Sequence, residues 1–204
     1  KSGMSIVEGL NMCPGAIIVR GNPEKYIDTS QRIFNVLKTF TEKVELYSID
    51  EGFLEINPEN MRHENLMRLG LSIKNAINKE TSLTCSIGIS CNKTVAKIAS
   101  DLCKPDGIMI VNESEIREFM KTLPVEKVPG IGPKMAEQLN LMGIEFCGQI
   151  EKIPLSLLKK KFGVRGEQVW YLCHGMGETK VRIQSPEPKS FGHSYTLRND
   201  TDDI

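Results

Sequence analysis

Two strand-like runs separated by only two residues, VELYSI at 44–49 and GFLEI at 52–56, constrain the fold more than any other stretch. Both runs are rich in β-branched, aromatic and aliphatic residues, and the tight connection predicts a hairpin. The connecting residues, Asp50 and Glu51, are both acidic. The fold should therefore contain a strand pair whose turn carries two adjacent carboxylates.

Helical patterns alternate with further strand-like runs up to residue 111. Across 24–40, and again across 66–77, apolar residues recur at the spacing of a helix with one buried face. The run LTCSIGISC at 83–91 predicts a buried strand, a helix follows it, and IMIV at 108–111 predicts a last short strand. This order predicts an α+β sheet with its helices on one face.

The two ends of the chain carry weaker patterns. Ser5 and Glu8 have capping-box spacing, so we expect a short helix that stops at Pro14, followed by a strand, AIIV, at 16–19. Beyond about residue 112 the strand signals vanish, and short helices are expected through 176. The stretch 184–194 contains two prolines and has no clear period, which is typical of a linker, and SYTL after it resembles the first strand of a further domain.

Composition excludes several classes of function. The chain has 204 residues, which favours one larger and one smaller domain, and Lys plus Arg balance Asp plus Glu at 26 each. Net charge therefore gives no argument for nucleic acid or membrane binding, and any charged site must be local. The six cysteines are scattered without zinc-like spacing, and no apolar run reaches the length of a membrane span. These features predict a cytoplasmic protein with reduced thiols.

The acidic pair has two interpretations. Asp is a common turn residue, and both side chains could simply face water. Alternatively, the strands fix both carboxylates in place, and carboxylates are ligands that Mg²⁺ prefers. Two such ions about 4 Å apart stabilise the attacking and leaving oxygens of a phosphoryl transfer. The position of Asp50 and Glu51 within a predicted sheet favours a metal site.

A second candidate site lies on the helix after the 83–91 strand. Lys93, Lys97 and Lys104 are spaced by four and seven residues, which places three ammonium groups along one face. A solvated lysine face is the usual meaning of such a pattern. A triphosphate also needs cations near its outer oxygens, and Lys104 at the helix end is placed to supply one.

The most specific local signal is VPGIGPKMAEQLNLMGI at 128–144. Gly130 and Gly132 flank Ile131, and Pro133 follows at a helix start, which predicts a helix-hairpin-helix. Such a hairpin directs backbone N–H groups outward and holds a phosphate without reading a base. Downstream, 152–166 contains a basic patch without any acidic residue, made of Lys152, Lys159, Lys160, Lys161 and Arg165.

Together these stretches resemble the Y-family (DinB/UmuC-like) translesion DNA polymerases, in the same order along nearly the whole chain. SIDEGFLEI at 48–56 is similar to the family's palm motif, and GISCNKTVAKIASDLCKPDG at 88–107 closely matches another family stretch. PGIG at 129–132 resembles the start of the thumb's helix-hairpin-helix, and FGHSYTL at 191–197 the entry into the little-finger domain. The sparse 180–190 region leans toward the UmuC-like branch.

The resemblance implies a palm with a ferredoxin-like antiparallel sheet and helices on one face, followed by a small all-helical thumb. The implied boundaries are 1–21 for a remnant of the fingers, 22–111 for the palm, 112–178 for the thumb, 179–190 for a linker and 191–204 for the start of the little finger. The implied activity is template-directed transfer of a dNMP from a dNTP to a primer 3′-hydroxyl, in bypass of damaged DNA. Recruitment by a sliding clamp or recombination protein would use other regions.

The resemblance also implies residue roles. Asp50 would be a ligand of both Mg²⁺ ions, Glu51 would sit by the primer end and the catalytic ion, and Lys104 would touch the incoming triphosphate. The DNA backbone would contact Gly130, Ile131, Gly132 and Lys134. The family's first metal-binding aspartate and its steric-gate aromatic residue are expected N-terminal to Lys1. The chain would then be a fragment with half of the metal site and little or no polymerase activity alone.

Two other function classes share parts of this pattern. Nucleotidyl cyclases also place acidic residues on a strand hairpin, but they need neither PGIG nor a basic segment after it. A non-catalytic DNA-binding scaffold could retain the palm and use the helix-hairpin-helix. An acidic residue in an apolar strand upstream would complete the metal site and favour the polymerase.

Overall fold

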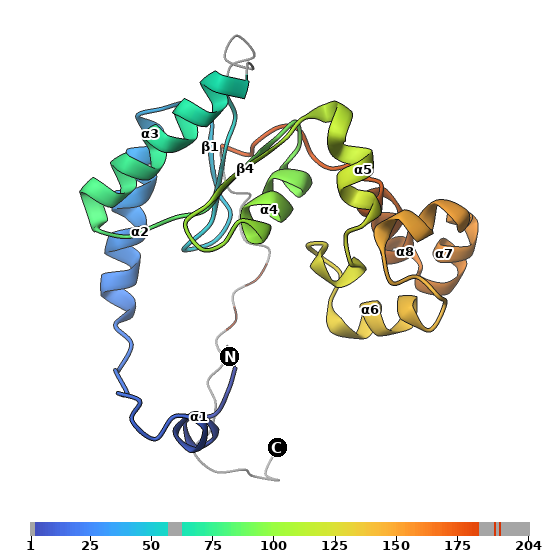
Figure 1. The fold of residues 1–204 in the computed structure, drawn as a ribbon, viewed down its shortest axis with the longest axis horizontal. Coiled ribbons are helices and arrows are strands. Elements are labelled where there is room, and N and C mark those ends of the chain that lie inside the picture. The colour runs from blue at the N-terminus through green and yellow to red at the C-terminus, as the bar shows by residue number, and fades with distance from the viewer. Residues whose placement is uncertain (1–2, 57–62, 184–189, 191, 193–204) are drawn as a thin grey trace.

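The computed structural model describes residues 3–56, 63–183, 190 and 192. Apart from a helix near the N-terminus, which lies away from the rest, its elements form a mixed α/β body from 23 to 111 and a helical body from 113 to 173 (Figure 1). This division confirms the predicted α+β first half and all-helical second half. The predicted linker and the strand after it fall almost wholly outside the described residues. No helix in the described ranges is both long enough and apolar enough to cross a membrane.

The N-terminal segment agrees with one prediction and contradicts another. Helix α1 (Ile6–Met12) begins as expected, because the Ser5 hydroxyl accepts a hydrogen bond from the Glu8 amide at 3.1 Å. The strand predicted at 16–19 was wrong, since these residues form no strand. Ile17, in this run, is 89% exposed. A strand needs a neighbouring strand for its hydrogen bonds, and within the described residues this run pairs with none.

The predicted hairpin is present. Strand β1 (Val44–Leu46) pairs antiparallel with β2 (Gly52–Leu54), with Glu45 opposite Phe53. Helix α2 (Pro23–Lys38) lies against the hairpin, and its buried and half-buried apolar residues share a small core with Val44 and α3. Val44 and Glu45 are neighbours on a strand, so their side chains point to opposite faces. Glu45 therefore points away from this core.

The remaining elements of the α/β body are, in order, α3 (His63–Thr81), β3 (Ile87–Ser90), α4 (Lys93–Leu102) and β4 (Ile108–Val111). Strands β3 and β4 run parallel, because α4 crosses between them. Ile87 packs with α3, whereas Gly88 faces α4. The prediction of one antiparallel sheet with helices on one face is thus corrected in two respects. One strand pair is parallel, and α3 and α4 cover opposite faces of it.

The helical body contains three short 3-10 turns and four helices. They are η2 (Glu113–Glu115), α5 (Ile116–Lys121), η3 (Val125–Lys127), α6 (Pro133–Asn140), η4 (Cys147–Lys152), α7 (Leu155–Phe162) and α8 (Val164–Cys173). Their apolar side chains surround a core in which Leu139, Ile150 and Leu158 are fully buried. The same core continues into α4 through Val95 and Ile98. The two bodies are therefore packed against each other.

A returning segment joins the two bodies a second time. After α8 the chain runs back to the α/β body, where the Lys93 amide donates a hydrogen bond to the Glu178 carbonyl at 2.9 Å. The Arg182 amide donates to Oε2 of Glu45 at 2.7 Å. Figure 1 shows this segment passing close to β1. The segment 178–183 thus ties the far end of the helical body to the strand pair that carries Asp50.

Candidate active site

The turn between β1 and β2 holds Asp50 and Glu51 in a defined arrangement. The amides of Tyr47 and Ser48 both donate to the Glu51 carbonyl at 3.0 Å, which closes the turn. The Ser48 hydroxyl donates to Oδ1 of Asp50 at 2.6 Å. The Ser30 hydroxyl on α2 donates to the Ile49 carbonyl at 2.6 Å and anchors the turn from outside. Two carboxylates therefore project from a fixed corner rather than from a loose loop.

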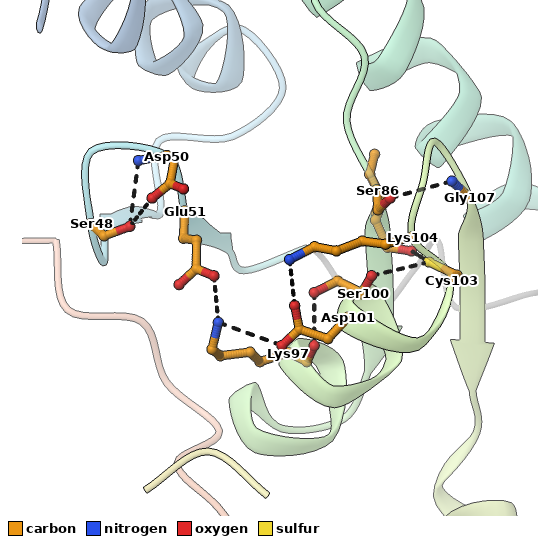
Figure 2. A network of polar contacts seen from close by, with 11 residues as sticks. Ser48, Asp50, Glu51, Ser86, Lys97, Ser100, Asp101, Cys103, Lys104 and Gly107 are labelled. Atoms are coloured by element: carbon orange, nitrogen blue, oxygen red, sulfur yellow. Dashed lines mark hydrogen bonds and ion pairs between the residues drawn. The ribbon is translucent and has the colours of Figure 1, made fainter. Parts of the chain in front are cut away.

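Helix α4 faces this corner with a row of alternating charges (Figure 2). Nζ of Lys97 lies 2.5 Å from Oε1 of Glu51 and 3.8 Å from Asp101. Nζ of Lys104 lies 2.6 Å from Oδ1 of Asp101. The hydrogen bond to Asp101, helped by the charges of Asp101, Glu51 and Asp50, raises the pKa of Lys104. This ammonium group is therefore firmly cationic and lies in the field of the turn carboxylates.

A cavity of about 1040 Å³ adjoins these charged groups. Asp50, Glu51 and Lys104 all line it, together with Lys97. The rest of its lining is mainly apolar and comes largely from α2, α3, β2, β3 and α4, with residues 179–181 of the returning segment. Among the described residues, β2 pairs only with β1, and β3 pairs only with β4. The cavity is thus lined by two strands that each have a free backbone edge.

The pair of carboxylates fits divalent metal binding in part. Asp50 and Glu51 offer the hard oxygen atoms that Mg²⁺ prefers, and Mg²⁺ commonly takes one or two carboxylates with phosphates and water. Within the part of the chain that the structure describes, no group of three or more His, Cys, Asp or Glu residues could hold a metal ion. The two residues therefore suit a site whose other ligands come from elsewhere.

The predicted hairpin in the helical body also has a defined geometry. Gly130 has φ +93°, a conformation that favours glycine, and Gly132 caps α6 with Pro133 at its first position. The Ile131 side chain is 6% exposed and packs into the core, and its amide donates to the Val128 carbonyl at 3.0 Å. Ile131 therefore supports the hairpin from inside. Gly132 and Lys134, by contrast, lie exposed at the α6 N-terminus.

The structure brings some predicted residues together and separates others. Asp50, Glu51 and Lys104 line one cavity, whereas the hairpin lies on the helical body (Figure 1). Lys93 lines the same cavity, where it pairs with Glu45 at 2.8 Å and Glu178 at 2.6 Å. All three lysines of the predicted lysine face are therefore engaged in ion pairs.

Sequence reasoning missed Asp101, which joins Lys97 to Lys104. Its spacing of four residues after Lys97 and three before Lys104 was a signal that could have revealed it. The basic patch predicted at 152–166 also includes a paired lysine, because Nζ of Lys159 lies 2.9 Å from Oε2 of Glu167.

Comparison with known proteins decides the family. Residues 1–101 match the model of the impB/mucB/samB family, and residues 126–176 match that of the DNA polymerase-iota thumb domain. The DNA polymerase IV of Shewanella amazonensis is 34% identical over 200 residues, which cover 98% of this chain and 56% of that protein. The chain belongs to the Y-family DNA polymerases.

Solved structures agree with this membership. DinB from Sulfolobus solfataricus is 31% identical with a TM-score of 0.78, over 86% of this Y-family chain and 52% of the other. A chain described as an insertion ternary complex of Dbh DNA polymerase is 31% identical with a TM-score of 0.82, over 89% of this chain and 53% of that one. The DNA polymerase IV of Lactococcus lactis is 35% identical over 96% of this chain and 53% of its own length. The chain spans about half the length of the curated relatives it matches.

Proposed function

We propose that this chain forms the palm, at 22–111, and the thumb, at 112–178, of a translesion DNA polymerase. The reaction is attack of a primer 3′-hydroxyl on the α-phosphate of a dNTP, with pyrophosphate leaving. The observation that carries the proposal is that Asp50, Glu51 and Lys104 line one cavity in a chain 34% identical to a DNA polymerase IV. The name of that relative and the insertion ternary complex among the structural neighbours favour the polymerase over a non-catalytic scaffold.

In this proposal the β1–β2 turn holds metal, and Lys104, just after the end of α4, holds the nucleotide. Asp50 and Glu51 would hold two Mg²⁺ ions, which when bound stabilise charge on the attacking and leaving oxygens. Lys104 binds the triphosphate, exchanging its bond with Asp101 for phosphate oxygens. Lys97 keeps the Glu51 carboxylate oriented by its 2.5 Å contact. The charged groups are thus already placed before substrate arrives, which reduces the reorganisation that the reaction requires.

The hairpin accounts for binding of primer-template DNA. Exposed Gly132 and Lys134 lie at the N-terminus of α6, where amide groups without helical acceptors and a positive dipole favour phosphate. These contacts carry no base information, which suits an enzyme that must move along any template. The backbone edges of β2 and β3 that line the cavity support a further proposal about the metal site. We expect an apolar strand carrying an additional aspartate to lie between them and complete the metal site.

The direct test uses Asp50→Ala and Glu51→Ala in the intact polymerase. Each variant should lose nucleotide incorporation by about three orders of magnitude, because charge stabilisation at the reacting phosphate is lost. DNA affinity should stay within about twofold, since the hairpin that holds the backbone is unchanged. Glu24→Ala, an exposed carboxylate on α2, is the matched control. Wild-type incorporation in both turn variants would reject the catalytic assignment.

A further inference from the structure

A largely buried lysine outside the charged row holds the turn that carries Lys104. Lys74 lies on α3, and its side chain is 13% exposed. Its Nζ atom donates to the Cys85 carbonyl at 2.9 Å. It also donates to the backbone carbonyl of Asp106 and forms an ion pair with the Asp106 carboxylate. One ammonium group therefore joins helix α3, the approach to β3 and the turn between α4 and β4.

The turn between α4 and β4 is also constrained at its C-terminal end, at Asp106 and Gly107. Asp106 has φ +54°, a left-handed conformation that Asp tolerates better than most residues. The Ile87 amide donates to the Gly107 carbonyl at 3.0 Å, and an ideal Cβ on Gly107 would lie 2.1 Å from the Cys103 carbonyl oxygen. The chain therefore has little freedom at Gly107. Lys104 begins this turn, so its backbone depends on how Asp106 is held.

The chemistry of the contact suits positioning rather than general stability. An ammonium group has three donor hydrogens, and the three acceptors around Lys74 can use all of them. Two of these acceptors belong to the left-handed residue of the turn. Replacing the ammonium by an apolar group would leave the carbonyl and the carboxylate of Asp106 without this donor, and the turn would relax. The effect should be concentrated on Lys104, which starts the turn only two residues before Asp106.

We propose that Lys74 is a positioning residue for nucleotide binding, acting through Lys104. The inference rests on the proposed function, in which Lys104 meets the triphosphate. Lys74 lines no part of the cavity that holds Asp50, Glu51 and Lys104, so it does not itself touch the nucleotide. Its role is to fix the α4–β4 turn so that the Lys104 ammonium points toward the turn carboxylates. Loss of Lys74 should weaken nucleotide binding and spare DNA binding.

A double-mutant cycle in the intact polymerase tests this role. Single-turnover incorporation is measured against dNTP concentration for wild type, Lys74→Met, Lys104→Ala and the double variant. Each single variant should raise the apparent dNTP Kd about fivefold to tenfold, as expected for loss of a charge-assisted contact. The double variant should be no weaker than Lys104→Ala alone, because Lys74 acts through that residue. Lys74→Arg, which keeps the charge and donors, should recover part of the affinity.

The outcomes separate the two proposals. Additive losses in the double variant would overturn the positioning role. So would a fall in DNA affinity and in the rate at saturating dNTP as large as the fall in dNTP affinity. Either result would leave the polymerase assignment standing. An unchanged dNTP Kd in Lys104→Ala would overturn both the role of Lys104 and the inference. Asp106→Asn is a second variant that keeps the carbonyl contact and removes the charge. Its side-chain site is 51% exposed, so the fold should tolerate it, and it should weaken dNTP binding in the same way but less.

Discussion

The Nζ atom of Lys93 lies 2.8 Å from Oε2 of Glu45, although the two residues are 48 positions apart and both side chains are largely buried. Lys93 also pairs with Glu178 at 2.6 Å, and Glu45 accepts a hydrogen bond from the Arg182 amide. Burial disfavours the charged lysine, but its hydrogen bonds to Glu178 and Glu45 outweigh that effect and raise the pKa of Lys93. This network joins β1, α4 and the returning segment 178–183.

Removing the lysine of this network should destabilise the protein. In Lys93→Met the Glu45 carboxylate stays buried without its cation. The free energy of unfolding should therefore fall by about 2–4 kcal/mol. Urea unfolding followed by circular dichroism measures the change. In Lys93→Met/Glu45→Met no buried charge is left, and much of the loss should be recovered. The matched control is Arg117→Ala, which breaks an exposed ion pair with Glu151 and should change little. A loss in Lys93→Met no larger than in Arg117→Ala would contradict the network's role.

The same network should make stability depend on pH. Hydrogen bonds first from Lys93 and then from Arg182 hold the pKa of Glu178 below its usual value. A lowered folded-state pKa gives stability that is complete above the unfolded-state pKa of roughly 4.3 and is lost as the pH falls through the folded-state value. Glu178→Gln should therefore flatten the fall in urea midpoint below about pH 4.5. The control is Glu24→Gln, which removes an exposed carboxylate on α2, away from this network. Parallel midpoint curves for wild type and Glu178→Gln would exclude this coupling.

Sequence patterns predicted the elements that a few neighbouring residues determine. The cap at Ser5, the hairpin around Asp50 and the start of α6 at Pro133 each depend on contacts within a few positions, and all three are present. The strand at 16–19 failed because strand formation depends on a remote partner. The parallel direction of β3 and β4 follows from the order strand, helix, strand, which the sequence showed but the prediction of an antiparallel sheet did not use.

The candidate site also contains residues that the sequence predicted and contacts that it could not predict. Asp50, Glu51 and Lys104 stand out by residue type and position, and the structure places them on one cavity. The long-range partners of Lys97 and Lys74 could not be predicted, because Lys97 meets Glu51 across 46 positions and Lys74 meets Asp106 across 32. Such pairs are set by tertiary packing and leave no local spacing to detect.

Close packing of α4 on β3 predicts that Gly88 tolerates no side chain. An ideal Cβ there would lie 1.9 Å from the Ala96 carbonyl oxygen and 2.4 Å from the Ser100 amide nitrogen. Gly88→Ala must push α4 away from the strand, and overpacking of this kind costs about 2–3 kcal/mol. Urea unfolding checks the loss. Gly15→Ala is the control, since no heavy atom lies within 4 Å of its Cβ position. A Gly88→Ala protein as stable as Gly15→Ala would show that α4 can shift freely.

The hairpin offers a variant that separates DNA contact from folding. Nothing lies within 4 Å of an ideal Cβ on Gly132, and its φ of −77° suits any residue, so Gly132→Ala should keep the wild-type Tm. The added methyl would nevertheless stand where, in the proposed function, a DNA phosphate approaches the α6 N-terminus, so affinity for DNA should fall. Lys134→Ala should weaken binding equally on all sequences and reduce the slope of log Kd against log salt by about one.

Fluorescence anisotropy with two unrelated primer-templates, measured over a range of salt concentrations, tests both hairpin variants. Lys38→Ala on α2 is the control, because it removes an exposed lysine from the other body. DNA affinity that falls as much in Lys38→Ala as in Lys134→Ala would show that general charge, rather than the hairpin, holds the backbone. A loss confined to one of the two sequences would show base recognition. Unchanged affinity in both Gly132→Ala and Lys134→Ala would place the DNA contact elsewhere on the helical body.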